Sequence, residues 1–373
     1  MQERKLLIFH QALAPYRVDF FNRLAERFDM DLVLFDTNLV NQNFDQAKLL
    51  GKMKCRVSYL LGGFKWKDRY FRTGAIRRIW KEKPDVVFGC EYSLATIAIA
   101  IYRFVFRSKF RLYTITDDNV AQFSARRGLK SVLRWLFVRL LDGFVVTNDE
   151  TKAAYEAITP KSCGIRYFVV PILHDEKEMR KNTATVIECG RRWRDVLVGG
   201  NSAAKVVLFV GRLDEVKNVK WLVEQFNSSA IKSDGEIFLV LVGAGPQEAE
   251  LRKYVQANGL ENVVMFGRKE GDELYGIMSA VDALVLPSGF EPYGAVVGEA
   301  LQWGTPCLVS DRVGAKGFVA DGTRGEVFRF GDADDFASKL QKVVNMKKSS
   351  EPLIGDELGI AVEALADDMV VSD

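Results

Sequence analysis

The stretch PSGFEPYGAVVGEALQWGTPCLVSD, residues 287–311, reads as a strand end, a loop, a short helix, a glycine stop and the next strand. Glu291 lies in the loop, and Glu299 lies in the otherwise apolar helix. A buried carboxylate without a partner is costly, so a ligand hydroxyl is one expected partner of Glu299. Gly294 and Gly298 bear no side chains where the helix begins, so its positive end is open to an anion. The stretch predicts a diphosphate site, although a solvated glutamate and turn glycines also fit it.

A second stretch, FVGRLDEVKN at residues 209–218, predicts two cations at the end of a buried strand. Arg212 and Lys217 follow the strand in its loop. Arg offers a planar fork of donors and Lys a compact charge, and together they suit a departing diphosphate. Taken alone, both residues are also ordinary surface charges. Because parallel strands open onto one edge of a sheet, we expect them to lie near residues 287–299.

Strand-like and helix-like segments alternate along the chain, which predicts parallel sheets covered by helices. The alternation runs twice, and a polar, glycine-bearing break separates its two halves. The length of 373 residues also exceeds a usual single core. We therefore expect an α/β protein with two Rossmann-like, doubly wound domains that face each other across a cleft. Its expected parts are an N-terminal domain (1–173), a linker (174–205), a C-terminal domain (206–350) and a tail (351–373) that packs back as a helix on the N-terminal domain.

Cysteine and histidine are sparse. The five cysteines are widely spaced, which suggests neither a disulfide framework nor a paired zinc site. His10 and His174 are the only histidines, and we interpret both as structural. The longest apolar run, 94–106, is shorter than the about 20 residues that cross a bilayer. The N-terminus also lacks the pattern of a signal peptide, so we expect a cytoplasmic protein.

Charge is distributed unevenly along the chain. Residues 1–173 carry 29 Lys and Arg against 17 Asp and Glu, whereas the remainder carries 23 against 32. The basic half predicts contact with an anionic membrane or an anionic acceptor, or else a solvated surface. The basic amphipathic segment 126–141, with Trp135 and Phe137, is either a packed surface helix or a helix that lies on a membrane. No nucleic-acid partner is expected.

Several segments together resemble the donor domain of the retaining glycosyltransferases of family 4, which have the GT-B fold. The resemblance covers about residues 206–330 and follows the order and spacing of the family. It rests on GRLDEVKN, LVGAGPQEAEL, VVMFGR, DALVLPSGFEP and the E-x7-E pattern of Glu291 and Glu299.

This resemblance implies roles for individual residues. Arg212 and Lys217 would contact the diphosphate, Glu291 the hydroxyls of the donor sugar, and Glu299 the ribose. The remaining donor-side candidates are the backbone groups that would meet the phosphates and sugar and the loop that would meet the base, namely Gly294, Ala295, Val296, Arg268 and Lys269. The base implied is uridine.

Residues 1–173 depart from the family pattern. The first loop, HQALAPYR, lacks the glycine pair that family members usually place near the donor, and LYTITDDN stands where many place a histidine. Acceptor-side candidates are therefore chosen from expected strand ends and the first loop, and each also fits a helix cap or a turn. They are Pro15, Tyr16, Glu91, Asp117 and Asp118.

Retaining transfer of this kind needs no strong protein base, because the leaving phosphate can take the acceptor proton. The expected catalytic residues are Arg212, Lys217, Glu291 and Asp117, which stabilise charge and orient the reacting groups. The motifs hold no Asp-x-Asp pair, so we expect no metal and no cofactor, with a nucleotide-sugar as co-substrate. The expected acceptor is a glycan or a lipid-linked molecule, as in the synthesis of surface polysaccharide or lipopolysaccharide.

Three other interpretations compete with this one. LVGAGPQEAEL resembles a dinucleotide-binding fingerprint, but Glu248 replaces its third glycine and the motif does not open the domain. A nucleotide-sugar epimerase or a hydrolase could use the same fold, although the E-x7-E pattern argues against both. A noncatalytic partner subunit could keep the donor domain and lack acceptor chemistry.

Overall fold

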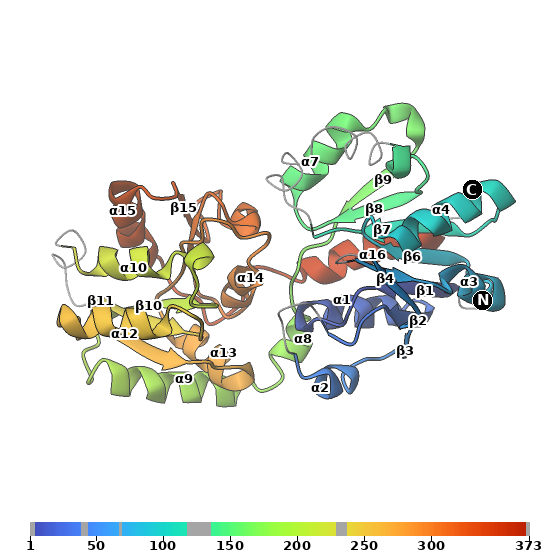
Figure 1. The fold of residues 1–373 in the computed structure, drawn as a ribbon. Helices are drawn as coiled ribbons and strands as arrows, with labels where there is room; N and C mark the ends of the chain where they lie inside the picture. The colour runs from blue at the N-terminus through green and yellow to red at the C-terminus, as the bar shows by residue number, and fades with distance from the viewer. Residues whose placement is uncertain (1–3, 39–43, 67–68, 118–135, 229–236, 371–373) are drawn as a thin grey trace. The chain divides into compact units, whose positions relative to one another are not determined.

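The computed structural model describes residues 4–38, 44–66, 69–117, 136–228 and 237–370. These divide into two compact units, one made of residues 1–175 and 356–373, the other of residues 176–355. Figure 1 shows each unit as a sheet with helices packed on it. Within each main sheet all pairings are parallel, and long apolar side chains fill the space between sheet and helices.

The first unit contains a seven-stranded sheet in the order β3-β2-β1-β6-β7-β8-β9. From β1 the successive strands are added toward one edge of the sheet, and from β6 they are added toward the other edge. The first unit is therefore doubly wound. The strands are β1 (Lys5–His10), β2 (Asp29–Leu34), β3 (Arg56–Tyr59), β6 (Val86–Cys90), β7 (Arg111–Ile115), β8 (Gly143–Val146) and β9 (Arg166–Val169), with a separate antiparallel hairpin of β4 (Gly63–Trp66) and β5 (Arg69–Arg72).

The helices of the first unit follow from caps and apolar spacing. Ser93 and Asn148 accept a backbone N–H through their side chains and so cap α4 and α7, and Pro15 occupies the first turn of α1. The helices are α1 (Pro15–Ala25), α2 (Gln46–Leu50), α3 (Ala75–Glu82), α4 (Leu94–Phe106), α7 (Asp149–Ile158) and α16 (Glu357–Val370).

The second unit contains a six-stranded sheet in the order β12-β11-β10-β13-β14-β15, which reverses between β10 and β13. Its strands are β10 (Lys205–Val210), β11 (Ile237–Val242), β12 (Val263–Gly267), β13 (Ala283–Leu286), β14 (Cys307–Ser310) and β15 (Gly325–Phe328). Its helices are α8 (Glu176–Met179), α9 (Thr183–Leu197), α10 (Val219–Phe226), α12 (Glu248–Ala257), α13 (Gly271–Ala280), α14 (Ala295–Gln302) and α15 (Ala333–Val344), with single turns η2 (Glu215–Lys217) and η3 (Gly314–Phe318).

Most of the segment expected as a linker, 174–205, is folded instead as part of the second unit. Helix α9 packs closely along α13, and a Cβ atom at Gly190 would lie 2.2 Å from the carbonyl oxygen of Gly276. Arg194 also pairs with Asp282 at 2.8 Å. The polar composition of this segment reflects one exposed helix face, because Val186 and Gly190 are buried on the other.

The expected tail forms α16, which belongs to the first unit and packs on α1 and β9. Asp368 accepts a hydrogen bond from the Tyr113 hydroxyl at 2.6 Å and pairs with Arg166 at 2.5 Å. The chain therefore leaves the first unit after Asp175 and returns to it at Asp356.

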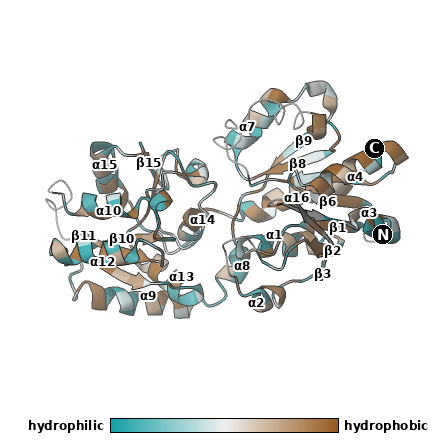
Figure 2. Ribbon diagram, in the orientation of Figure 1, coloured by the Kyte–Doolittle hydropathy of each residue, from teal (hydrophilic) through white to brown (hydrophobic). Residues whose placement is uncertain are grey.

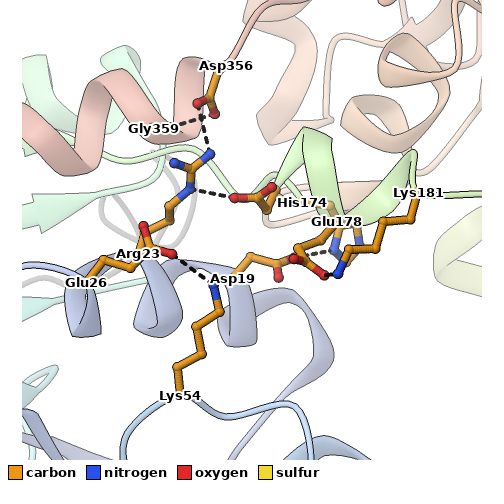
Figure 3. A network of polar contacts seen from close by, with 10 residues as sticks. Asp19, Arg23, Glu26, Lys54, His174, Glu178, Lys181, Asp356 and Gly359 are labelled. Carbon is orange, nitrogen blue, oxygen red and sulfur yellow. Dashed lines mark hydrogen bonds and ion pairs between the residues drawn. The ribbon is translucent and has the colours of Figure 1, made fainter.

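Arg23 in α1 pairs with the residues at both of these crossing points. Its Nε atom lies 2.5 Å from Asp175, and an Nη atom donates to Asp356 at 2.9 Å (Figure 3). Asp356 in turn accepts the backbone N–H of Gly359 at 3.0 Å, in the first turn of α16. The Arg23 guanidinium group thus pairs with the residue at which the chain leaves the first unit and with the residue at which it returns.

The segment 126–141 lies mostly outside the described residues, as do Trp135 and Asp118. Its described end includes Phe137, which is buried in the core of the first unit. Among the residues that the structure describes, no helix is both long and apolar enough to cross a bilayer.

Candidate functional site

The loops that follow β10, β11, β12 and β13 meet at the carboxyl edge of the second sheet. The N–H of Gly211 donates to Val242 at 3.0 Å, and that of Gly243 donates to Gly267 at 2.8 Å. The N–H of Gly289 donates to Val216 at 2.9 Å, which joins the loop after β13 to the turn η2. Ligands of doubly wound folds bind at this edge, where the strand order reverses.

Lys217 and Glu291 form an ion pair at this point of reversal. Their side chains are only 16% and 12% exposed. Asp214 shapes the turn that carries Lys217, because its side chain accepts the Lys217 N–H at 3.2 Å and pairs with Arg212 at 3.1 Å. The two stretches that the sequence predicts to lie close therefore meet through a direct contact.

Gly294 begins helix α14 in the left-handed conformation, with a φ of +93°. An added Cβ atom would lie 3.0 Å from the side chains of Leu286 and Val313 and 3.2 Å from that of Glu291. No side chain caps the helix at this end. The first turn, with Ala295 and Val296, thus presents the positive end of the helix beside Glu291.

The other predicted donor-side residues lie on neighbouring elements of the same unit. Arg212 is mostly exposed, and Glu299 is half-buried in α14. Arg268 and Lys269 follow β12, where they pair with Glu270 and Glu273. The structure thus brings Lys217 into contact with Glu291, places Gly294 beside Glu291, and places the remaining residues after β10, after β12 or on α14.

The loop after β14 supports the site and was not predicted. The N–H of Gly314 donates to Glu291 at 3.0 Å, and that of Ala315 donates to Tyr293 at 2.7 Å. A Cβ atom at Gly314 would lie 2.1 Å from the carbonyl oxygen of Pro292, so only glycine fits there. The glycine soon after the strand in CLVSDRVGAKG is the signal that could have pointed to this loop.

The glycines of LVGAGPQEAEL have a packing role. A Cβ atom at Gly243 would lie 1.8 Å from the carbonyl oxygen of Gly211, and one at Gly245 would lie 2.4 Å from that of Leu213. The close approach of these two loops therefore explains the resemblance of the motif to a dinucleotide fingerprint.

In the first unit, predicted acceptor-side residues gather at the carboxyl ends of β1, β6 and β7. Asp117, which follows β7, forms an ion pair with Arg17 of α1. Arg17 is 1% exposed, whereas the Asp117 side chain is 37% exposed. Burial raises the pKa of Tyr16 to about 12, and the nearby charge of Asp117 acts in the same direction. The sequence did not single out Arg17, because its partner lies 100 positions away.

His10, Pro15 and Glu91 complete this edge of the first sheet. The Nδ1–H of His10 donates to the Ala12 carbonyl at 3.0 Å, and burial, followed by the charge of Arg17, lowers the pKa of His10 to about 4. Pro15 begins α1. Glu91 directly follows β6 and has a φ of +44°, in the turn that leads into α4. His10 is thus a neutral side chain within the structure at physiological pH.

Sequence comparison finds similar proteins for the second unit. Residues 198–355 match the model of the family described as glycosyl transferases group 1. The lipopolysaccharide core biosynthesis glycosyltransferase LpsE of Rhizobium meliloti is 31% identical over 38% of this chain and 40% of its own length. Lipopolysaccharide 1,6-galactosyltransferase of Salmonella typhimurium is 30% identical over 38% of this chain and 40% of its own length. The matches therefore span less than half of either relative.

Structural comparison covers the whole chain. The lipopolysaccharide outer core galactosyltransferase WaaB superposes with a TM-score of 0.67 at 17% identity, over 97% of this chain and 99% of its own. Anabaena HepE, solved in complex with UDP and glucose, superposes with a TM-score of 0.65 at 16% identity, over 98% and 95%. Such low identities show the fold alone. The chain has the GT-B fold with two Rossmann-like units, and its residues 198–355 are similar to the glycosyl transferases group 1 family.

Proposed function

We propose that this protein is a retaining glycosyltransferase of family 4 that moves a sugar from a nucleotide diphosphate donor to a hydroxyl group. The observation that carries the proposal is the contact between Lys217 and Glu291 beside the N-terminus of α14. A cation and a helix end suit a diphosphate, and a carboxylate suits sugar hydroxyls.

In the proposed reaction the bond between the anomeric carbon and the diphosphate oxygen breaks. The acceptor oxygen bonds to the same face of that carbon, and its proton passes to the departing phosphate. Lys217, Arg212 and the N-terminus of α14 stabilise the charge that develops on the diphosphate. Glu291 orients the sugar, Glu299 contacts the ribose, and the loop with Arg268 and Lys269 meets the base. No protein base and no metal ion takes part.

On the acceptor side, we propose that Asp117 contacts the acceptor hydroxyl, with Pro15, Tyr16 and Glu91 nearby. Asp118, which we also propose for the acceptor, lies outside the described residues. The exposed Asp117 carboxylate, held by the buried Arg17, supports this role. The proposed acceptor is a glycan or a lipid-linked molecule in surface polysaccharide or lipopolysaccharide synthesis. The names of the two lipopolysaccharide relatives and the basic first half of the chain support this class. The proposed donor base is uridine, as in the ligand of HepE.

The first test is a thermal-shift screen of the purified protein with UDP, GDP, ADP and their sugar conjugates. A ligand at a hundred times its dissociation constant adds about 2.7 kcal/mol of stability. We expect UDP or its conjugates to stabilise the protein, and Lys217→Ala and Glu299→Ala to lose this effect. Lys220→Ala is the matched control, because Lys220 pairs with Glu250 outside the site. A lack of any nucleotide effect would overturn the donor site.

Turnover assays separate the remaining interpretations. We expect the sugar to be transferred with retained anomeric configuration, which NMR of the product would measure. We also expect the activity to be the same with and without a metal chelator. Donor binding without transfer would instead indicate a noncatalytic partner subunit. Conversion of one nucleotide-sugar into another would indicate an epimerase. An inverted product would contradict the retaining mechanism.

A further inference from the structure

Helix α4 presents an apolar surface to solvent. Its thirteen residues, LATIAIAIYRFVF, are apolar apart from Thr96, Tyr102 and Arg103, and Figure 2 shows α4 largely in the brown of hydrophobic residues. Thr96, Ile99 and Ala100 are buried against the sheet. The large exposed side chains are Leu94, Ile101, Phe104, Val105 and Phe106, of which Phe104 is 71% and Phe106 68% exposed. We call these five residues the α4 surface.

A cationic hollow adjoins the C-terminal end of this surface. Its volume is about 650 Å³, and its lining contains Arg103, Arg107 and Arg139 together with Phe104 and Val105. No acidic residue is among the described residues that line it. Arg103 pairs with Asp142. The side chains of Arg107, at the end of α4, and of Arg139 are exposed. Apolar side chains and guanidinium groups therefore share one face of the first unit.

The neighbouring helix α3, which packs against α4, repeats this combination. Trp80 is 71% exposed and Ile76 is also exposed, and Arg77 and Lys81 of the same helix are exposed cations. Tryptophan, phenylalanine and basic residues together are typical of segments that lie at the boundary between lipid headgroups and acyl chains. Large exposed apolar patches mark interaction sites in soluble proteins.

The charge on this face decides between possible occupants. A symmetric dimer that covered both the α4 surface and the hollow would gather the Arg107 and Arg139 guanidinium groups of two copies in one interface, which like-charge repulsion disfavours. An anionic bilayer satisfies both features, because its phosphates attract guanidinium groups and its acyl region accepts aromatic side chains. Among the described residues this face therefore fits an anionic lipid surface best.

We propose that the α4 surface docks on membranes that contain anionic phospholipid. Phe104, Val105 and Phe106 enter the boundary between headgroups and acyl chains, and Arg107 and Arg139 bind lipid phosphates at the hollow. This site shares Arg139 with the segment 126–141, which the sequence suggested for membrane contact, but its apolar residues all lie on α4. Binding here is independent of donor binding and of catalysis, because the surface lies on other residues.

The test is flotation of the full chain with phosphatidylcholine vesicles, with and without phosphatidylglycerol. We expect binding only to the anionic vesicles, with affinity that falls as salt increases. Phe104→Glu should weaken partition more than about tenfold, because it removes the burial of one aromatic side chain and adds a charge. Arg107→Gln should weaken it about fivefold, the typical effect of one cation near an anionic surface.

Matched controls separate the α4 surface from general effects. Ile360→Glu changes a side chain that is 68% exposed on α16 of the same unit, and Arg192→Gln removes an exposed arginine from α9. Both should float like the unmodified protein. All variants should keep their melting temperature and their stabilisation by nucleotide, so a failed donor site is distinguished from failed docking.

Three results would overturn the proposal. One is equal flotation of Phe104→Glu and Ile360→Glu, which would assign any membrane binding to other residues. Another is a molar mass by light scattering that shows a dimer which Phe104→Glu dissociates, because the α4 surface would then be an interface between copies. The third is absence of flotation with anionic vesicles at low salt, because the protein would then not bind such membranes.

Discussion

The Lys217 ammonium group pairs with the Glu291 carboxylate, although the two residues lie 74 positions apart in the sequence. The pair joins the turn after β10 to the loop after β13, the two strands between which the sheet order reverses. Both side chains are largely shielded from water, so each charge depends on the other or on a ligand.

Replacement of Lys217 tests whether this side chain stabilises the departing diphosphate. We expect Lys217→Ala to lower kcat by about a hundred- to a thousandfold, or about 3–4 kcal/mol, because a preorganised donor to the departing diphosphate is lost. Steady-state kinetics with the donor found by thermal shift is the measurement, and Lys220→Ala is the control. Unchanged turnover in Lys217→Ala would remove this residue from the mechanism.

A methyl group at Gly294 tests the start of α14. We expect Gly294→Ala to cost about 1–3 kcal/mol of stability, because it forces a side chain into the left-handed region and against Leu286 and Val313. Donor affinity should also fall, since the helix end moves. Gly322→Ala is the control, because its φ of +75° is also positive but nothing lies within 4 Å of the added atom. Calorimetric titration should show normal donor binding in the control only.

Replacement of Asp368 tests how much the contacts of α16 stabilise the first unit. We expect Asp368→Ala to lower the free energy of unfolding by about 1–3 kcal/mol, because it leaves the Tyr113 hydroxyl and the Arg166 guanidinium without this acceptor. Asp367→Ala, one residue earlier, removes an exposed pair with Arg27 and should cost at most about 1 kcal/mol. Urea denaturation of both variants makes the comparison, and equal losses would contradict it.

His10 makes stability depend on pH in a defined window. Its pKa is about 4 in the folded protein, against 6.5 for an unperturbed histidine. Between these values the unfolded chain binds a proton that the folded protein does not, so stability falls as the pH falls from 6.5 toward 4. From pH 7 to pH 5 the loss attributable to His10 should be about 2 kcal/mol. In urea denaturation, His10→Gln should lack this part of the loss; an identical pH profile would contradict the assignment.

The second sheet and its site could be predicted from the sequence because their signals are local. Each strand is a continuous apolar run, and the residues of each loop follow their strand directly. Parallel strands place such loops on one edge, so Lys217 and Glu291 could be expected to lie close without knowledge of their contact. Gly314 supports the same loop through its close approach to Pro292, and the only sequence signal for this contact is a glycine soon after β14.

Other features depend on contacts between distant residues. Helix α9 was expected as a linker because its exposed face is polar, and only its packing on α13 shows where it belongs. Arg17 reads as an ordinary surface arginine until β7 brings Asp117 beside it. The apolar run 94–106 was judged only by its length, and the exposure of Phe104 appears only once α4 is placed on its sheet.

The ion pairs of Arg23 with Asp175 and Asp356 join parts of the chain that the ribosome makes at different times. The second unit is one unbroken segment, so all of its residues are available as soon as residue 355 has been made. The first unit has residues on both sides of the second in the sequence, and it lacks α16 until residues after 355 have been added. Contrary to the usual order of synthesis, in which a preceding domain is completed first, the unit whose residues precede the second unit is here completed after it.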